Sequence, residues 1–422
     1  MLSSVYGCDN VLRGDEMNEV NQIIFFYNPY KIKTPIRLIE LFAGIGAQSK
    51  ALERLNIPFE HHYICEFDKY AVCSYNAIHG TNFRTSDITT IHADDLAITN
   101  TDKFTYIMTY SFPCQDLSIA GKQKGMSKGS KTRSGLLWEV ERLINECTEL
   151  PQVLLMENVT QVHGKKNKAD FDKWCDFLQS KGYSNYWQDL NAKNYGVPQN
   201  RNRTFMISLL GNYKYEFPET FELELRLKDV LENEVDDSYY LSDKGIEYVK
   251  KRDGKYTRIN PEIPCAITAR GNQNWTGNFI EEEMPKRLLN IYGQDKGTGY
   301  AGNVWDKDKI SPTINTCQGG NRQPMIIEEP IICASRGHNP NNQKDRQGFK
   351  VQNDYRIRKL TQLECWRLMN FGDEDFYAAQ KALNNTFYKG SNRSKSQLYK
   401  QAGNSIVVNV LCEIFNALLK KE

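Results

Sequence analysis

The first half of the chain repeats one pattern: an apolar run typical of a buried strand, then a turn, then a helical spacing of apolar residues. The first copy is Ile36–Phe42, which leads through Ala43-Gly44-Ile45-Gly46 into the helical stretch AQSKALERL. Later apolar runs are His62–Glu66, Tyr106–Thr109, Val153–Met156 and Thr204–Leu210, with helical patterns such as Leu136–Glu149 and Phe171–Gln179 between them. Strands that alternate with helices predict an α/β fold, with a mostly parallel sheet and helices on both faces.

The pattern changes near Gly211, so we expect more than one domain in these 422 residues. Residues 211–355 alternate acidic stretches with turn-rich segments, and a helical pattern returns only at Thr361–Asn370. An amphipathic helix is expected to close the chain from about Ser405. We therefore predict an N-terminal extension (1–33), a discontinuous α/β domain (34–210 and 356–422) and a smaller loop-rich domain (211–355).

Composition excludes several classes of protein. The 54 Lys and Arg residues nearly balance the 52 Asp and Glu residues, which excludes a histone-like polycation but leaves room for a locally basic cleft. The most apolar long stretch, Ile406–Leu419, is interrupted by Asn409, Glu413 and Asn416, so we expect no membrane span. The start of the chain lacks a secretory signal pattern, and the 11 cysteines include no C-x-x-C pair. These features predict a cytoplasmic protein with reduced thiols and no structural metal site.

The glycine-containing turn after the first strand is a candidate cofactor site. Gly44 and Gly46 let the backbone approach a ligand at the carboxyl end of a strand, where open α/β sheets bind cofactors. Glu66 suits the diol of a ribose, and the later acid Asp87 could accept a hydrogen bond from an adenine amino group. Each acid taken alone is more often a solvated charge or a helix cap.

Cys114 is a candidate nucleophile. A lone cysteine is usually a small buried hydrophobe, but this one follows a proline at the end of a strand and precedes a loop. The stretch from Leu117 to Trp138 has no acid and carries five basic residues: Lys122, Lys124, Lys128, Lys131 and Arg133. Such a loop can be a disordered solvent loop, but we favour a mobile lid that grips phosphates. Nearby cations would increase the thiolate fraction.

Two later segments supply polar side chains at the same predicted edge of the sheet. Glu157 closes the run that ends at Met156 and could hydrogen bond to a heterocycle or protonate it. Arg201 and Arg203 follow Gln199, and side chains two residues apart share a face of an extended chain. The arginine pair could grip a base carbonyl or phosphates, whereas a surface salt bridge is the alternative for either arginine alone.

Taken together, these segments resemble the C5-cytosine DNA methyltransferases. The matching segments occur in the order of that family: IELFAGIGA, CEFD, SDI, SFPCQDLS, MENV, QNRNR, RIRKLTQLECWRLMNF and QAGNSIVVNV. These segments cover about 36–210 and 356–420. Pro-Cys-Gln, Glu-Asn-Val and Gln-x-Arg-x-Arg in one order are a far more specific signal than any one of these motifs alone. The catalytic segments are similar to those of bacterial CpG methylases, and the tail is similar to that of restriction-modification methylases.

The resemblance implies a Rossmann-like methyltransferase domain that uses S-adenosyl-L-methionine. Cys114 would add to C6 of a flipped cytosine while Glu157, next to Asn158, holds N3. Arg203, assisted by Arg201 and Gln199, would bind the base. The implied cofactor residues are Phe42, Ala43, Gly44, Ile45, Gly46, Glu66, Phe67, Asp87, Ile88, Pro113 and Leu137, together with Asn404 and Ser405 at the start of the last helix.

The resemblance also implies double-stranded DNA as the partner and residues 211–355 as the target-recognition region. The implied DNA contacts are Ser118, Lys122, Gln123, Lys124, Lys131, Arg133, Thr313, Ile314, Gly319 and Gly320. Ala266-Ile267-Thr268 is a rival for the position of Thr313-Ile314 at the bases, because the two segments are similar. We expect a monomer of bacterial or phage origin, with any cognate restriction endonuclease acting separately.

Two alternatives stay open on the sequence. A tRNA cytosine-C5 methyltransferase would share the fold, although the Cys-Phe-Thr marker of that group occurs nowhere in the chain. A catalytically inactive DNA-binding relative would not need Cys114, Glu157 and Arg203 together. The sequence does not specify the recognised DNA motif.

Overall fold

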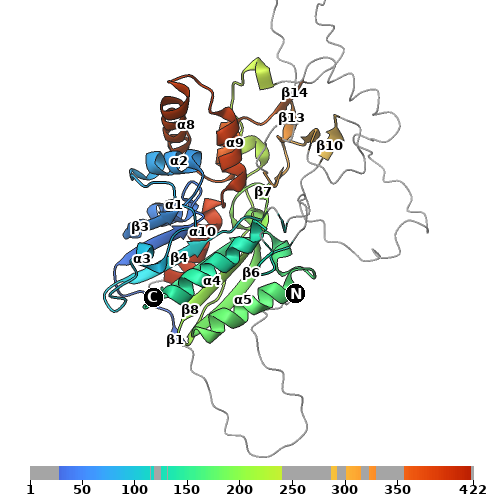
Figure 1. The fold of residues 1–422 in the computed structure, drawn as a ribbon. Helices are drawn as coiled ribbons and strands as arrows, with labels where there is room; N and C mark the ends of the chain where they lie inside the picture. Colours follow the sequence, from blue (N-terminus) through green and yellow to red (C-terminus); the bar gives the residue numbers. More distant parts are fainter. Residues whose placement is uncertain are drawn as a thin grey trace, which may run out of the picture.

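A computed structural model describes residues 28–114, 116–117, 125–130, 132–239, 287–291, 301–314, 323–328 and 356–419 (Figure 1). Most of the extension predicted at 1–33 lies outside these residues, and so does the rival segment Ala266-Ile267-Thr268.

The centre of the fold is a six-stranded sheet in the order β3-β2-β4-β5-β8-β6. Its strands are β2 (Ile36–Leu41), β3 (Phe59–Cys65), β4 (Thr105–Tyr110), β5 (Val153–Asn158), β6 (Tyr183–Asn191) and β8 (Asn202–Leu210). Neighbours from β3 to β5 are parallel, whereas β8 is antiparallel to both β5 and β6. The predicted mostly parallel sheet is confirmed. Sequence analysis does not find β6, because this edge strand is mostly half-buried and lacks an apolar run.

The helices have clear start and stop signals. α2 begins after Asp68, whose side chain accepts the N–H of Tyr70, and it ends at Gly80 in the left-handed conformation. The α-helices are α1 (Ala47–Arg54), α2 (Lys69–His79), α3 (Ala93–Leu96), α4 (Leu137–Glu146), α5 (Lys168–Ser180), α7 (Gln362–Leu368), α8 (Asp373–Tyr388), α9 (Lys395–Asn404) and α10 (Val408–Leu419). Short 3-10 helices are η1 (Ser134–Leu136), η2 (Thr160–His163), η3 (Ala192–Tyr195), η4 (Leu227–Val230) and η5 (Asp237–Tyr239).

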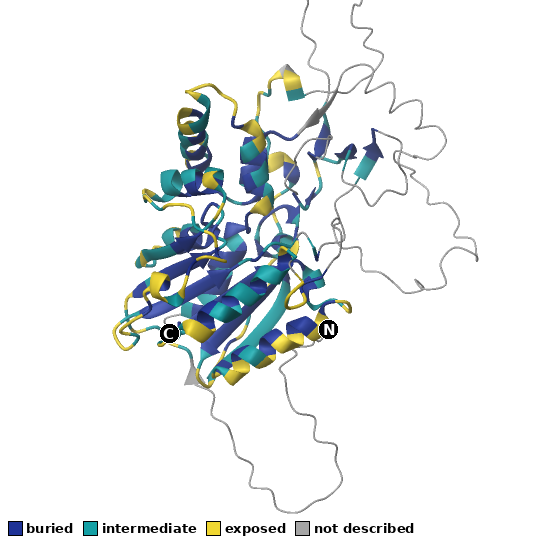
Figure 2. Cartoon of the chain, in the orientation of Figure 1, coloured by how far each residue is buried: buried dark blue, intermediate teal, exposed yellow. Residues whose placement is uncertain are grey.

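Helices cover both faces of the sheet, as the sequence predicts. Successive residues of a strand point to opposite faces. Leu38 of β2 belongs to the core that includes α1 and α10, whereas the adjacent Ile39 belongs to the core that includes α4 and α5. Ile107 and Met108 of β4 divide in the same way. Figure 2 shows the central strands as a largely buried layer between these helices.

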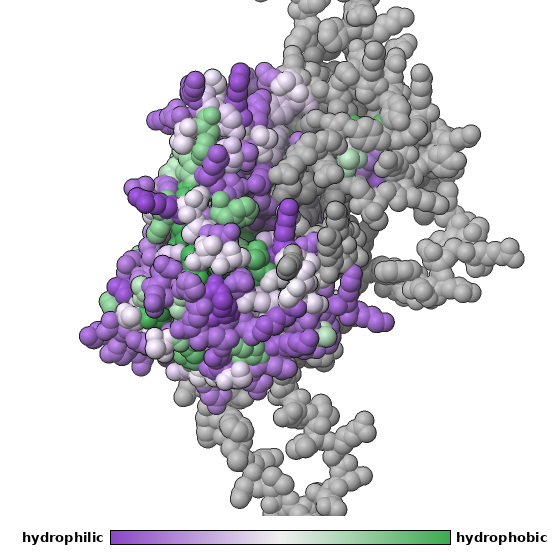
Figure 3. Space-filling model, in the orientation of Figure 1, coloured by the Kyte–Doolittle hydropathy of each residue, from purple (hydrophilic) through white to green (hydrophobic). Residues whose placement is uncertain are grey.

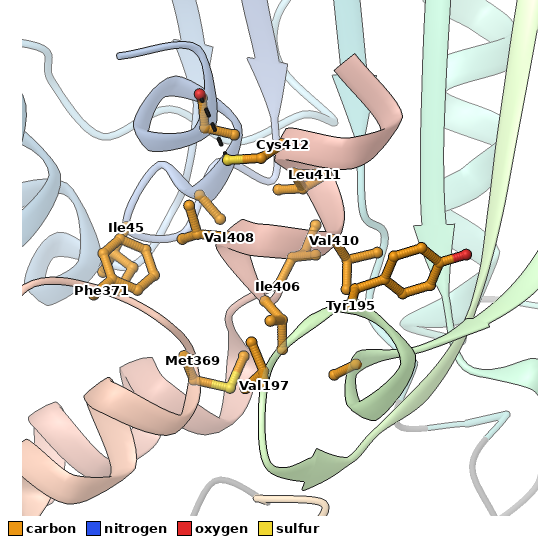
Figure 4. Packing of buried hydrophobic residues seen from close by; sticks show 14 of the residues in the cluster. Ile45, Tyr195, Val197, Met369, Phe371, Ile406, Val408, Val410, Leu411 and Cys412 are labelled. Atoms are coloured by element: carbon orange, nitrogen blue, oxygen red, sulfur yellow. Dashed lines mark hydrogen bonds between the residues drawn. The ribbon is translucent and has the colours of Figure 1, made fainter. Parts of the chain in front are cut away.

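The end of the chain packs into the main core. Cys412 of α10 lies with its sulfur 3.8 Å from the carbonyl oxygen of Ala51 in α1 (Figure 4). Ile406 packs in the same core as Val197 and Met369 (Figure 4). Residues 395–419 are long and apolar enough to pass for a membrane span by composition, yet 61% of this stretch's apolar window is buried inside the fold. Such burial is what a core helix shows.

The closing helix begins later than the sequence predicts. α9 ends at Asn404, Ser405 is extended (φ −75°, ψ 167°), and α10 starts only at Val408. Asn404 and Ser405 therefore lie at a bend between two helices and not at the start of the last one. Gly403, Asn404 and Ser405 all have low helix propensity, but the apolar spacing continues through them and hides the break.

A smaller sheet lies beside the main one in the order β10-β11-β13-β14. Its strands are β10 (Arg287–Asn290), β11 (Asn303–Trp305), β13 (Met325–Glu328) and β14 (Arg356–Lys359). Leu289, Val304 and Met325 form part of its small core. Because β14 lies beyond residue 355, this sheet crosses the predicted domain boundary. The division at 211 and 355 stays a prediction.

Two short strand pairs join segments that the sequence analysis assigns to different parts of the chain. β12 (Ser311–Pro312) runs parallel to β7 (Gln199–Asn200), and β1 (Asn28–Pro29) runs parallel to β9 (Tyr213–Lys214). Leu227 of η4 is also fully buried in the main core. The region after residue 211 is thus anchored to the large domain at β12 and at Leu227, whereas β9 pairs with the N-terminal extension.

Candidate active site

The carboxyl ends of β2, β3, β4 and β5 meet at one edge of the sheet, and the antiparallel β8 begins at that edge. A cavity of about 720 Å³ lies there, lined by residues that follow each of these strands. In the view of Figure 3, apolar surface is exposed between the polar surfaces over α2 and α8 and over α4 and α5. Open α/β sheets bind their ligands at this edge.

The turn after β2 is shaped by close contact with α2. Gly46 has a φ of 77°, and a Cβ there would overlap His79 Nε2 and lie 2.6 Å from Tyr75 Cε2. His79 Nε2 is 3.1 Å from the carbonyl oxygen of Ile45, and its Nδ1 is 2.6 Å from Glu53 Oε1. Position 46 therefore requires glycine, both for its backbone conformation and for the space that α2 leaves.

Glu66, directly after β3, is held by backbone donors. Its Oε2 accepts the N–H of Gly44 at 3.0 Å, and its Oε1 accepts the N–H of Asp68 at 2.8 Å. Burial raises the pKa of Glu66, whereas these two donors lower it. Each carboxylate oxygen can accept a further hydrogen bond, so the pair fits the two hydroxyls of a ribose.

Phe67, Asp87 and Ile88 form the neighbouring wall of the cavity. Phe67 is 73% exposed, which leaves a ring face for a flat ligand. Asp87 Oδ1 accepts the backbone N–H and the hydroxyl of Thr89 at 2.9 and 2.8 Å. Glu66 can accept hydrogen bonds from hydroxyl groups and Asp87 from an amino group, and apolar side chains lie next to them. This combination fits a nucleoside.

The segment that carries Cys114 is fixed on both sides. Asn158 at the end of β5 donates through Nδ2 to the carbonyl oxygen of Phe112 at 2.9 Å. Ser134 donates to the carbonyl oxygen of Pro113 at 2.6 Å, and the N–H of Leu117 donates to that of Cys114 at 3.0 Å. These three bonds hold the backbone of residues 112–114, so the thiol has a defined place in the cavity.

Glu157, Arg203 and Cys114 share one end of the cavity. Burial raises the pKa of Cys114; Arg203 and Arg201 lower it, and Glu157 raises it. The sequence expectation that cations would increase the thiolate fraction is therefore outweighed by burial. Burial also raises the pKa of the Glu157 carboxyl, and this effect outweighs the two arginines, which lower it. Arg203 Nε lies 3.3 Å from Glu157 Oε1.

Gln199 and Arg201 are bonded to backbone of distant segments. Gln199 is fully buried: its Nε2 donates to the carbonyl oxygen of Leu368 at 2.6 Å, and its Oε1 accepts the N–H of Ile314 at 3.0 Å. Arg201 donates to the carbonyl oxygens of Ile314 at 2.9 Å, Ser405 at 2.7 Å and Gly403 at 3.2 Å. Their predicted help to Arg203 at the base stays a prediction.

The C-terminal segment contributes one wall of the cavity. Asn404 and Ser405 line the cavity, together with Lys400 and Gln401. Lys400 Nζ is 2.7 Å from Asp68 Oδ2. These contacts place the end of α9 against the start of α2.

The structure brings most of the sequence-predicted residues to this one cavity. The predicted residues that line it are Phe42, Ala43, Gly44, Ile45, Glu66, Phe67, Asp87, Ile88, Pro113, Cys114, Arg133, Glu157, Asn158, Arg201, Arg203, Asn404 and Ser405. Gly46, Gln199 and the buried Leu137 lie behind this wall, and Leu136 takes the place expected for Leu137. Thr313 and Ile314 lie beside β7 and not on the cavity wall.

Other predicted DNA contacts lie outside the described residues: Ser118, Lys122, Gln123, Lys124, Lys131, Gly319 and Gly320. Sequence analysis missed lining residues such as Gln48, Leu136, Lys400 and Gln401. Lys400 and Gln401 directly precede the Ala-Gly-Asn-Ser stretch that carries two predicted cofactor residues. This proximity in the sequence is the signal that could have identified them.

A histidine cluster beneath the turn after β2 also escapes sequence analysis, because its members are far apart in the chain. Glu53, His61 and His79 place possible metal-ligand atoms within 4.8 Å of one another. Lys50 Nζ lies 2.8 Å from Glu53 Oε2, so a cation already compensates this carboxylate.

Comparisons with known proteins agree with this geometry. A family model described as C-5 cytosine-specific DNA methylase matches residues 36–420. The type II methyltransferase M2.ScrFI of Lactococcus lactis subsp. cremoris is 29% identical, over 92% of this chain and all of that protein. The type II methyltransferase M.HhaI of Haemophilus parahaemolyticus is 31% identical, over 90% of this chain and 92% of that protein.

Solved structures give the same fold. The crystal structure of the S. pombe Dnmt2 methyltransferase superimposes with a TM-score of 0.57, covering 91% of this chain and 98% of that chain at 18% identity. At this identity the likeness shows the α/β fold and nothing of the substrate.

Proposed function

This chain belongs to the C-5 cytosine-specific DNA methylases, and from that premise we propose that it methylates C5 of a cytosine flipped out of a short specific sequence in duplex DNA. The protein is thus a DNA (cytosine-5-)-methyltransferase and depends on S-adenosylmethionine as its family does. The observation that carries the proposal is the single cavity, with thiol, carboxyl and guanidinium groups at one end and the acids Glu66 and Asp87 at the other.

Covalent catalysis makes C5 reactive. Cys114 loses its proton to solvent and its thiolate sulfur bonds to C6; the C5–C6 electron pair shifts to C4–C5, and the C4–N3 pair moves onto N3, which takes a proton from Glu157. C5 is then enamine-like and takes up a methyl group. Loss of the C5 proton to a base re-forms the C5–C6 double bond, expels the Cys114 thiolate and returns the N3 proton to Glu157. Glu157 is paired with Arg203 in the free enzyme, and burial raises its pKa, which makes it easier for the carboxylate to take up the proton that this role requires.

The residues of the other end fit S-adenosylmethionine, which supplies an electrophilic methyl group when bound. Glu66, with both oxygens oriented by backbone N–H groups, would hold the ribose hydroxyls. Asp87 would accept a hydrogen bond from the adenine amino group, and Phe67 and Ile88 would contact the adenine ring. Phe42–Ile45, Pro113, Asn404 and Ser405 complete this part of the pocket.

The target carbon is inaccessible in a stacked duplex, so the cytosine must be extruded at a cost of a few kcal/mol. We assign DNA binding to the basic loop after Cys114, Arg133 included, and to Thr313-Ile314. Target recognition is assigned to residues 211–355. The enzyme acts as a monomer on cytoplasmic DNA of a bacterium or phage. Any cognate endonuclease is a separate protein.

The test is base-resolution sequencing of 5-methylcytosine in plasmid DNA from a methylation-free host that expresses the chain. We expect one short motif to be methylated, and none in the Cys114→Ser variant, which keeps cofactor binding. Cys73→Ser is the matched control, because Cys73 is partly exposed and lies in α2, away from the cavity lining. Soluble wild-type protein that binds S-adenosylmethionine and methylates no cytosine would refute the proposal.

A second experiment tests the domain assignment. Residues 211–355 would be replaced by the corresponding region of a relative with a different target. The methylated motif should change to that of the donor, while Cys114 dependence stays. An unchanged motif in an active hybrid would show that recognition lies elsewhere.

A further inference from the structure

The segment Ser311–Ile314 is docked on the strand that leads into the active site. Ser311 and Pro312 pair in parallel with Gln199 and Asn200, and the N–H of Ser311 donates to the carbonyl oxygen of Pro198 at 2.6 Å. The hydroxyl of Thr313 donates to the carbonyl oxygen of Asn200. Backbone and side-chain bonds thus fix this segment against residues 198–200.

Two buried side chains extend the attachment to the rest of the site. Gln199 accepts the N–H of Ile314 through Oε1, and Arg201 Nη1 donates to the carbonyl oxygen of the same residue. Arg201 Nη2 donates to the carbonyl oxygens of Gly403 and Ser405. The peptide groups of Ile314 and of the bend after α9 are therefore held by one guanidinium.

The two ends of this connection belong to different ligands in the proposed function. Gly403 and Ser405 line the cavity at the cofactor wall, whereas Ser311–Ile314 belongs to the region assigned to DNA. Arg201 is only 4% exposed, and its planar fork can reach carbonyls in several fixed directions, which a lysine ammonium on a flexible stem cannot.

We propose that Arg201 and Gln199 are positioning residues that hold Ser311–Ile314 and the Gly403–Ser405 bend in one arrangement, so that target DNA strengthens the binding of S-adenosylmethionine. The proposal rests on the proposed function for the identity of the two ligands. By linkage, the cofactor strengthens DNA binding by the same factor. These two side chains act through the backbone they hold, whereas Arg203 faces the reacting base beside Glu157.

The experiment measures the dissociation constant of S-adenosylmethionine with the full chain, with and without a duplex that carries the methylated motif. In wild type we expect DNA to tighten binding at least about fivefold, the lower end of typical coupling between sites. In Arg201→Lys the ratio of the two constants should fall to near one. In Arg203→Lys, the matched control two residues away, turnover should fall while the ratio stays at the wild-type value.

Thr313→Val provides a second variant if Arg201→Lys does not fold, since it removes only the hydroxyl bond to Asn200. Its ratio should lie between one and the wild-type value. A wild-type ratio in a folded Arg201→Lys or Thr313→Val protein would overturn the proposal, as would a wild-type ratio of one. Binding is measured without turnover, so the inference can fail while wild-type methylation succeeds. Absence of methylation would instead refute the proposed function.

Discussion

The Nε atom of Arg203 lies 3.3 Å from Oε1 of Glu157, and both side chains line the cavity that contains Cys114. Their charges act on the thiol in opposite directions. Burial raises the pKa of Cys114 most, Arg203 lowers it, and Glu157 raises it by a smaller effect. The free enzyme therefore keeps Cys114 mostly as the thiol. The effects of Arg203 and Glu157 on the pKa of this thiol can be tested separately.

Substitution of either neighbour should change the reactivity of Cys114 in opposite senses. Arg203→Met should slow alkylation by iodoacetamide at neutral pH, and Glu157→Gln should accelerate it. Each pKa unit changes the thiolate fraction about tenfold, so changes of up to about that size are expected. The rate is followed by mass spectrometry of the Cys114 peptide, with the Cys73 peptide as internal control. Changes of the same sign in both variants would contradict this electrostatic account.

The two glycines of the turn after β2 should respond very differently to alanine. At Gly46 a Cβ would overlap His79 and crowd Tyr75, and φ is 77°; we expect a loss of about 2–4 kcal/mol in the free energy of unfolding. Gly44 has a φ of 57° but nothing within 4 Å of its Cβ position, so only the backbone cost of about 1 kcal/mol applies. Urea denaturation of both variants checks this order, and equal losses would be inconsistent with the contact to α2.

Sequence reasoning works here where function depends on short segments at strand ends. Cys114 follows β4, and Glu157 lies at the carboxyl end of β5, which is adjacent and parallel to β4, so their convergence follows from the alternating pattern alone. The family resemblance is likewise carried by contiguous motifs. These parts of the site can be predicted because short contiguous segments of the sequence specify them.

What the sequence did not predict depends on long-range packing. The bonds of Gln199 to Leu368 and Ile314 join residues more than 100 positions apart, and no local pattern specifies them. The exchange of Leu137 for Leu136 on the cavity wall is a shift of one residue at the start of α4, where a 3-10 turn precedes the helix. Strand β6 was not predicted, because it lies at the edge of the sheet, is mostly half-buried there and so lacks the apolar run that marks a buried strand.

The cluster beneath the turn after β2 should make stability fall on mild acidification. Burial and the charge of His79 lower the pKa of His61 from its ordinary 6.5 to about 4. Between these values the unfolded chain binds a proton on His61 that the native protein does not, so stability is lost as pH falls through this window. For Glu53, burial is outweighed by His79 and Lys50, and its pKa falls from 4.5 to about 2, which adds a second loss at lower pH.

The variant His61→Gln should remove the first of these losses. Its melting temperature should fall less than that of wild type between about pH 7.5 and pH 5, because glutamine does not titrate. Differential scanning calorimetry at both pH values provides the measurement. His92→Gln is the matched control, since the His92 side chain is 70% exposed. Parallel pH dependence in His61→Gln and wild type would rule out His61 as the titrating group.

Lys400 and Asp68 should stabilise the contact between α9 and α2 as a pair. Their charged atoms are 2.7 Å apart at the cavity wall, and their side chains are 30% and 15% exposed. Because the pair is partly solvated, we expect a coupling of about 0.5–1 kcal/mol, smaller in high salt. Asp68→Asn keeps a helix cap at this position, so a double-mutant cycle with Lys400→Met isolates the ion pair. Unfolding in urea and cofactor binding are measured for all four proteins. Strictly additive effects would show that the pair contributes nothing and that α9 is held by Gln401, which donates to the carbonyl oxygen of Tyr70 at 3.0 Å.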